Sequence, residues 1–106
     1  MNLEKEGDIL RVNRVKALDA TNSSEFQRRT ISELETTTKW LEINMSQVRH
    51  LDCFGVGVLI ALRDLMRRRG GELRVLEPSP PAQQFMELTR ASRLLKIVKF
   101  EDAIVC

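Results

Sequence analysis

Apolar and polar residues alternate with two different periods along the chain, and these periods predict where strands and helices lie. Two strand-like pieces open the chain, at residues 2–6 and 9–15, on either side of the turn signal "EGD". We expect these two strands to pair as a hairpin. Near the other end, a last short strand is predicted for "LLKIVKF", followed by a terminal turn or helical piece in "EDAIVC".

A strand in the middle of the chain predicts how the sheet is covered. In "KWLEINMSQV", Leu41, Ile43 and Met45 alternate with Glu42 and Asn44, which gives one apolar face and one polar face. A sheet covered by helices on both faces would show a nearly continuous apolar run here. The alternation therefore favours helices on one face and a second face that is at least partly wet.

Three stretches have the period of a helix, and the first lies between the hairpin and this strand. It follows the N-cap types of residues 22–24, and the threonines of residues 36–38 are expected to end it because they are poor helix formers. The residues expected on its inner face are Phe26, Thr30, Ile31 and Leu34.

The second helix follows Asp52 and carries a long core-facing stripe. It is expected to end at the basic residues 67–69, which lie at the negative end of the helix dipole, with Gly70 as a left-handed terminator. The stripe consists of Val58, Leu59, Leu62, Leu65 and Met66. An arginine cluster here stabilises the helix end, with an acidic partner or a lipid headgroup as the alternative interpretation. The cluster comprises Arg63, Arg67, Arg68, Arg69 and Arg74.

The third helix comes after a further strand in "ELRVLEP". Ser79 suits its N-cap and Pro80 its first helical position. The residues expected to face inward are Phe85, Met86 and either Leu88 or Thr89.

The order of these elements predicts the fold class. The last two-thirds of the chain is strand, helix, strand, helix, strand, and such short connections require right-handed crossovers between parallel strands. With the N-terminal pair added, we expect an α/β fold with a mixed four- to five-stranded sheet and helices packed mainly on one face. Residues 1–106 are expected to form one domain.

Composition excludes several classes of function. The 106 residues carry 17 basic and 15 acidic side chains, and a net charge of +2 does not suggest a nucleic-acid-binding protein. The N-terminal "MNLEKEGD" has no apolar core like that of a signal peptide, and the longest apolar run, "FGVGVLIAL", is far shorter than the about 20 residues of a membrane span. We therefore expect a cytoplasmic protein with no nucleic-acid partner and no membrane insertion.

Few residues could carry catalysis. His50 is the only histidine, which excludes metal sites built on several histidines, and Cys53 and Cys106 have no metal-like spacing. A nucleophile pair of Cys53 and His50 would need unusual geometry, and "GVG" lacks the spacing and the lysine of a P-loop. We expect no metal, no cofactor, no catalytic residue and no enzymatic activity.

The start of the second helix, "HLDCFGVG", holds the most unusual residues of the chain. Asp52 is expected to cap the helix, and Cys53 is interpreted as a small buried hydrophobic residue rather than a reactive thiol. Gly55 and Gly57 destabilise a helix relative to alanine. Either they let another backbone come close, or they keep the turn bare for a partner.

The order of these features resembles the STAS domain, the module shared by sulfate transporters and bacterial anti-sigma-factor antagonists. The resemblance rests on a strand, an Asp-x-x-Gly-x-Gly helix start, the turn-strand-turn "RGGELRVLEPSP" and a short helix before a leucine pair. It extends back through "EGDILRV" and "LDATNSSEF", so nearly the whole chain is covered.

For the antagonist branch, the resemblance implies docking on a kinase-type anti-sigma factor, ended by phosphorylation of a hydroxyl at this helix start. The usual text is Asp-Ser-Ser-Gly or Asp-Ser-Thr-Gly, with the second hydroxyl as acceptor, whereas this chain has Asp52-Cys53-Phe54-Gly55. Phe54 thus replaces the acceptor. Its ring either anchors an interface or packs into the core, and the core is favoured.

The resemblance implies a non-catalytic protein–protein interaction module of a partner-switching system. Its partner would be an anti-sigma factor or a kinase-like regulatory protein, and Ser23, Ser24 or Ser46 could carry a phosphate instead. The alternatives are an accessory subunit of a bacterial lipid-transport ATP-binding complex, with a transporter ATPase as partner, and a small-ligand sensor. The sequence also leaves open whether the protein forms a weak homodimer. The expected partner-binding residues are Asp52, Cys53, Phe54, Gly55, Val56 and Gly57.

Overall fold

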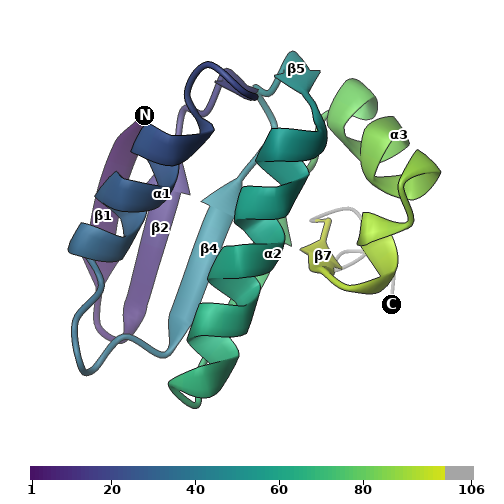
Figure 1. Ribbon diagram of the computed structural model, residues 1–106. Coiled ribbons are helices and arrows are strands. Elements are labelled where there is room, and N and C mark those ends of the chain that lie inside the picture. Colours follow the sequence, from purple (N-terminus) through teal and green to yellow (C-terminus); the bar gives the residue numbers. More distant parts are fainter. Residues whose placement is uncertain (100–106) are drawn as a thin grey trace.

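The computed structural model describes residues 1–99, so the terminal piece expected in "EDAIVC" lies outside the described residues. A five-stranded sheet in the order β1-β2-β4-β6-β7 forms its centre (Figure 1). The first two strands pair antiparallel as the expected hairpin, and the other neighbours are parallel. The strands are β1 (Asn2–Glu6), β2 (Ile9–Asn13), β4 (Trp40–Asn44), β6 (Glu72–Leu76) and β7 (Lys96–Val98).

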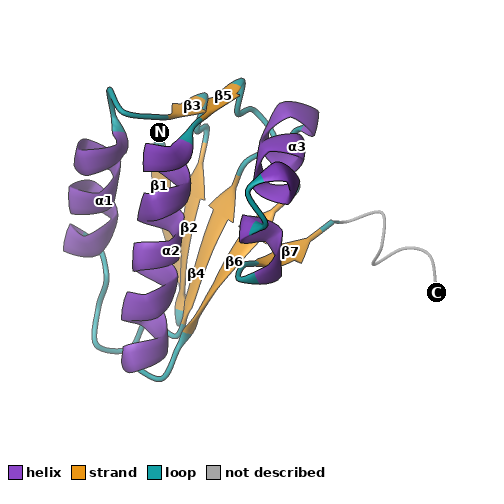
Figure 2. Ribbon diagram, turned by 45° about the vertical axis from the view of Figure 1, so that its right-hand side comes forward, coloured by secondary structure: helices purple, strands orange, loops and turns teal. Residues whose placement is uncertain are grey.

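Three helices cover one face of this sheet (Figures 1 and 2). They are α1 (Ser23–Ser32), α2 (Cys53–Arg68) and α3 (Pro80–Leu88). The strands from β2 to β7 follow each other across the sheet in one direction, and right-handed crossovers then place every connecting helix on the same side. The expected α/β fold with a mixed sheet and one-sided helices is confirmed.

The core lies between the sheet and the helices. Alternate strand residues are in register across the sheet and point toward the helices: Leu10, Leu41 and Leu73 form one row, and Val12, Ile43 and Val75 the next. From α2, the expected stripe meets these rows, with Leu65 only half-buried at its margin. The fully or largely buried members of the stripe are Val58, Leu59, Leu62 and Met66.

The opposite face of the sheet carries no helix and is built of paired charges. The side chain of Glu42 on β4 is only 8% exposed; it accepts a hydrogen bond from Arg11 on β2 at 2.8 Å and forms an ion pair with Arg74 on β6 at 3.2 Å. The guanidinium of Arg74 also stacks 3.8 Å from the centre of the Trp40 ring. The polar face expected from the alternation in β4 is therefore present. Its central carboxylate, that of Glu42, is shielded from solvent by the paired arginines.

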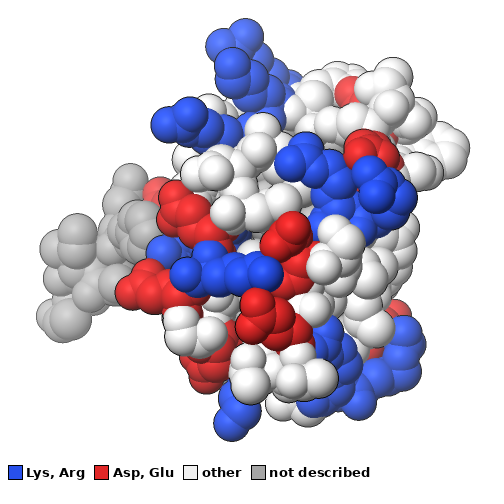
Figure 3. Space-filling model, turned by 90° about the vertical axis from the view of Figure 1, so that its left-hand side faces the viewer, with Lys and Arg blue, Asp and Glu red and all other residues white. Residues whose placement is uncertain are grey.

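Acidic and basic side chains also intermingle at the β1 side of the molecule (Figure 3). There the Lys5 ammonium lies 3.0 Å from Glu35 and 3.1 Å from Glu33, in the segment after α1. These two carboxylates, Glu35 foremost, raise the pKa of Lys5. The pairs join the end of α1 to the edge strand.

Several local expectations differ from the structure. The first helix ends at Ser32, before the threonines, and Ile31 on it is exposed rather than inward-facing. Leu88 and Thr89, the two alternatives for a further inward-facing residue of α3, are both exposed, so this expectation is wrong. A two-stranded parallel sheet of β3 (Ala17–Leu18) and β5 (His50–Leu51), and the 3₁₀ helix η1 (Ala91–Arg93), have no periodic pattern of their own and were not expected.

Candidate functional site

The start of α2 is held by one carboxylate that makes two backbone contacts. Oδ1 of Asp52 accepts a hydrogen bond from the Gly55 N–H at 3.0 Å, which is the expected N-cap. Its Oδ2 accepts a second from the Ala20 N–H at 3.0 Å, in the loop between β3 and α1. Asp52 therefore fixes the first turn of α2 and ties it to a loop that lies far away in the sequence.

The small β3–β5 sheet also joins the start of α2 to the segment before α1. Ala17 pairs with His50 and Leu18 with Leu51, so the strand that leads into α2 is locked to the strand that leads into the loop before α1. Nδ1 of His50 lies 3.0 Å from Oδ2 of Asp19, so this ring nitrogen is engaged by the carboxylate. Hydrogen bonds from Thr21, foremost that of its hydroxyl, and then from His50 lower the pKa of Asp19.

The two glycines of the helix start have opposite surroundings, so each fits a different one of the two alternatives left open by the sequence. A Cβ placed on Gly55 would lie 2.1 Å from the carbonyl oxygen of Leu18 and 2.8 Å from the side chain of Leu51. Only glycine lets the first turn of α2 come this close to β3. A Cβ on Gly57 would meet nothing within 4 Å, so Gly57 is free of packing and leaves the surface bare.

The side chains of the helix start divide into two sets. Val56 is buried in the core and Gly55 is covered by β3, so neither presents a side chain to solvent. Cys53, Phe54 and Gly57 face outward, and Phe54 is 65% exposed. We call these three residues the helix-start surface. The expectation that Phe54 packs into the core is wrong, as is the interpretation of Cys53 as buried.

The geometry of the helix explains the exposure of Phe54. On a helical wheel it lies roughly a quarter-turn from the middle of the buried stripe, on the side of Gly57. Within residues 1–99, no other element covers this side of the first turn closely enough to bury the ring. Most of the Phe54 ring is therefore left uncovered by the residues that the structure describes.

Sequence reasoning did not find a second apolar feature next to the helix start. Leu88 on α3 is 75% exposed and borders a small cleft of about 190 Å³ beside β5. The cleft is formed between His50 and Leu51 on one side and Pro81, Phe85 and Leu88 on the other. No periodic signal marks it, because it depends on how α3 packs beside a strand of two residues.

Other kinds of site have little support in the described part of the chain. Residues 1–99 contain no group of three or more histidine, cysteine, aspartate or glutamate side chains that could hold a metal ion. None of the helices in that range is long and apolar enough to cross a membrane. The thiol of Cys53 is exposed at the start of α2, and Nδ1 of His50 is engaged by Asp19.

Comparison with protein-family models gives a match to the STAS domain over residues 1–104. The chain belongs to the STAS domain family. Among solved structures, this STAS domain superposes on the crystal structure of TM1081 from Thermotoga maritima with a TM-score of 0.81 and 20% identity, covering 91% of this chain and 83% of the other. It superposes on the anti-sigma factor antagonist SpoIIAA in its unphosphorylated form with a TM-score of 0.69 and 19% identity, covering 97% and 91%.

A third similar structure belongs to the stressosome, a signal integration and transduction hub. The TM-score is 0.64 with 20% identity, and the superposition covers 91% of the STAS domain and 85% of that chain. At these identities the likenesses establish the shared fold. The role of the helix-start residues in partner binding stays a prediction.

Proposed function

We propose that this STAS domain is a non-catalytic protein–protein interaction module that docks on an anti-sigma factor or a kinase-like regulatory protein in the cytoplasm. The helix-start surface is the docking site, and Phe54 is its anchor. The observation that carries the proposal is the exposure of Phe54, at 65%, on a helix start whose backbone is fixed by Asp52. The likeness to SpoIIAA and to a stressosome structure supports the choice of partner class.

An exposed aromatic ring on a rigid turn is suited to binding. Burying the exposed share of Phe54 under a partner would contribute about 1–2 kcal/mol, given about 1.5–3 kcal/mol for a complete phenylalanine side chain. The two hydrogen bonds to Asp52 hold the turn before binding, so little backbone entropy is lost on docking. Aromatic residues at the centre of an interface are common hot spots.

The residue type at position 54 also means that docking here would not be ended by phosphorylation of the usual hydroxyl. The resemblance implies a hydroxyl at residue 54, and the outward direction of this side chain would make such a hydroxyl accessible to a kinase. A phosphate there would place nearly two negative charges beside Asp52 at the interface, which opposes docking. Phe54 accepts no phosphoryl group, so the complex is not released by phosphorylation at this residue.

Other hydroxyls differ in their access to a kinase. Ser23, at the start of α1, is buried and does not suit phosphorylation in the folded domain. Ser24 and Ser46 are exposed, and either could carry a regulatory phosphate. Ser46 lies in the turn after β4, before the strand that leads into α2, and is the nearer of the two to the helix start in the sequence.

An affinity pull-down from the native lysate, with partners identified by mass spectrometry, tests the proposal. The wild type is compared with Phe54→Asp and with Ile31→Asp, which puts the same charge on an exposed apolar residue of α1. We expect an anti-sigma factor or kinase-like protein that Phe54→Asp loses and Ile31→Asp keeps. Equal recovery by all three proteins would contradict docking through this surface. Capture of a transporter ATPase would assign the protein to a lipid-transport complex instead.

A further inference from the structure

The helix α3 carries two apolar stripes, and only one of them faces the core. Ala82 and Met86 form the inner stripe and are fully buried. Pro81, Phe85 and Leu88 form a second stripe, about a third of a turn away, on the side of α3 toward β5 (Figure 1). Leu88 is 75% exposed. The second stripe is therefore only partly covered by the described residues.

The cleft of about 190 Å³ beside this stripe is small and partly apolar. Leu51 and His50 of β5, preceded by Arg49, line one side, and Leu88 borders the other. The volume is below the about 300–1,000 Å³ of small-molecule sites, so the cleft suits one inserted apolar side chain better than a free ligand. The surface thus combines a cleft with an exposed leucine that could fill such a cleft in another molecule.

Charges of opposite sign lie at the two ends of this surface. Arg49 is exposed on the β5 side of the cleft. Glu87 is exposed next to Leu88, and the helix turns it to the side of Leu88 that lies away from the cleft. Within residues 1–99 neither charge has an ion-pair partner, and the Glu87 carboxylate accepts a hydrogen bond from Gln83 at 2.6 Å. Across the surface the order is therefore Arg49, cleft, Leu88, Glu87.

This order is complementary to itself. If a second copy is rotated by half a turn about an axis between the cleft and Leu88, each leucine enters the cleft of the other copy. The same rotation brings Arg49 of each copy against Glu87 of the other. The apolar side chain, the cleft and both charges that a second copy needs are all present on one surface, which is the condition for an isologous dimer.

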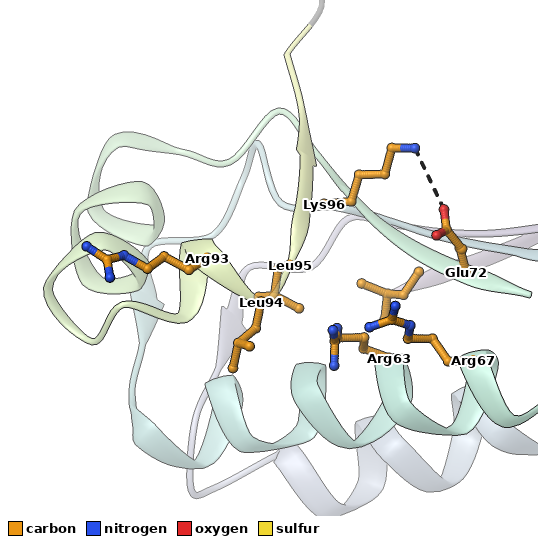
Figure 4. Close-up of a pocket in the computed structure, with 8 residues that line it drawn as sticks. Arg63, Arg67, Glu72, Arg93, Leu94, Leu95 and Lys96 are labelled. Carbon is orange, nitrogen blue, oxygen red and sulfur yellow. Dashed lines mark ion pairs between the residues drawn. The ribbon is translucent and has the colours of Figure 1, made fainter.

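The other exposed leucine of this region does not meet that condition. Leu94 borders a cleft of about 260 Å³ beside Arg63 and Arg67 of α2 (Figure 4). Glu72 is the one carboxylate among the described lining residues, and it is paired with Lys96 at 3.7 Å. Two copies of this surface would bring arginine side chains together, which opposes self-association.

We propose that the protein forms a weak isologous homodimer through the α3 surface, with Leu88 of each copy in the cleft of the other and Arg49 paired with Glu87. The contact is small, so its dissociation constant is expected on the order of 0.1–1 mM. Phe54 is not among the residues that line the cleft, and the homodimer is independent of docking at the helix-start surface.

Sedimentation equilibrium and amide chemical shifts of the ¹⁵N-labelled protein, measured over about 0.02–2 mM to bracket this constant, test the dimer. We expect concentration-dependent shifts centred on residues 49–51 and 81–88. Leu88→Asp should weaken association about tenfold or more, because it places a charge in an apolar cleft. Ile31→Asp and Phe54→Asp are matched controls at exposed apolar residues of other helices, and both should associate like the wild type.

Charge reversal tests the pairing of Arg49 with Glu87. Arg49→Glu alone and Glu87→Arg alone each place like charges opposite one another twice, and each should weaken self-association about tenfold. In an equimolar mixture of the two variants both contacts again join opposite charges, so the mixed dimer should regain the wild-type affinity. Recovery on mixing requires a surface that meets its own copy with these two residues opposed.

Three results would overturn the proposal. They are a monomer mass at every concentration, shifts centred on Phe54 instead of α3, and no gain of association when the two charge variants are mixed. Recovery in the mixture, together with the loss in Leu88→Asp, would support it. Unchanged thermal midpoints of the variants establish that the fold is intact, as expected for substitutions of exposed residues.

Discussion

Replacing Gly55 with alanine tests how closely α2 packs on β3. The added Cβ would lie 2.1 Å from the Leu18 carbonyl oxygen, where ordinary contacts are 3.4 Å or more, so the helix start must move by over 1 Å. The atoms it meets include backbone of β3, which cannot turn aside as a long side chain could. Moving them strains the β3–β5 pairing and the second hydrogen bond of Asp52.

The expected magnitude is the difference between two effects. Overpacking of this kind destabilises by about 1–3 kcal/mol or more, and a clash with backbone belongs at the upper end. Alanine gains about 1 kcal/mol over glycine as a helix former. A net loss of about 2 kcal/mol follows, which lowers the thermal midpoint of a domain this size by roughly 8–16 °C.

Gly57→Ala is the matched control, because the same substitution two residues later meets nothing within 4 Å. It should raise stability by up to about 1 kcal/mol through helix propensity alone. Urea unfolding followed by circular dichroism at 222 nm measures both variants. Opposite signs are expected. If Gly55→Ala were as stable as the wild type, the close approach of α2 to β3 would not exist in solution and the account of the helix start would be refuted.

Three further predictions concern polar contacts. Asp52→Ala should destabilise by about 1–2 kcal/mol in urea unfolding, because it removes both the N-cap and the bond to Ala20; a loss no larger than that of an exposed aspartate would contradict this. Glu42→Gln should destabilise by about 1–3 kcal/mol, since two arginines lose their shared carboxylate, whereas Glu25→Gln on the surface should leave the thermal midpoint unchanged. The pKa of Asp19 is lowered in the folded state, so its contribution is present above its unfolded pKa of about 3.9 and is lost as pH falls through the folded value. Melting curves from pH 6 to pH 2 should therefore fall less steeply below pH 4 for Asp19→Asn than for the wild type, and parallel curves would rule out the contribution.

The sheet and the order of its elements could be predicted because the signals are local. The alternation from Leu41 to Met45 is a property of one strand, and it correctly indicated a covered face and an open face. The α2 stripe and the cap at Asp52 are likewise contained within a few residues. Right-handed crossovers then leave little choice of topology.

The exposure of individual apolar residues could not be predicted in the same way. Ile31, Phe54 and Leu88 are apolar residues on helices, and each is exposed. Whether such a residue is buried depends on which neighbouring element reaches that side of the helix. Periodicity gives the direction of a side chain relative to its own helix, and the neighbours are decided by tertiary packing.

The two glycines show the same limit more sharply. Their residue type and their positions in one helix turn are alike, yet Gly55 touches β3 and Gly57 faces solvent. The difference depends on β3, a strand of two residues that forms only by pairing with β5. The cleft beside Arg63 and Arg67 could not be predicted either, because residues of η1 and β7 form part of its lining.

The helix start separates residues that the fold needs from residues that it does not. Asp52 holds the turn, Gly55 permits its close packing and Val56 fills the core. Phe54 does none of these, and a polar side chain in its place would leave every described contact of the turn intact. Because Phe54 is 65% exposed, most of its apolar surface stays in water and contributes little to the stability of the folded state. Selection for folding alone would therefore not favour phenylalanine at this residue, whereas a partner that covers the ring would.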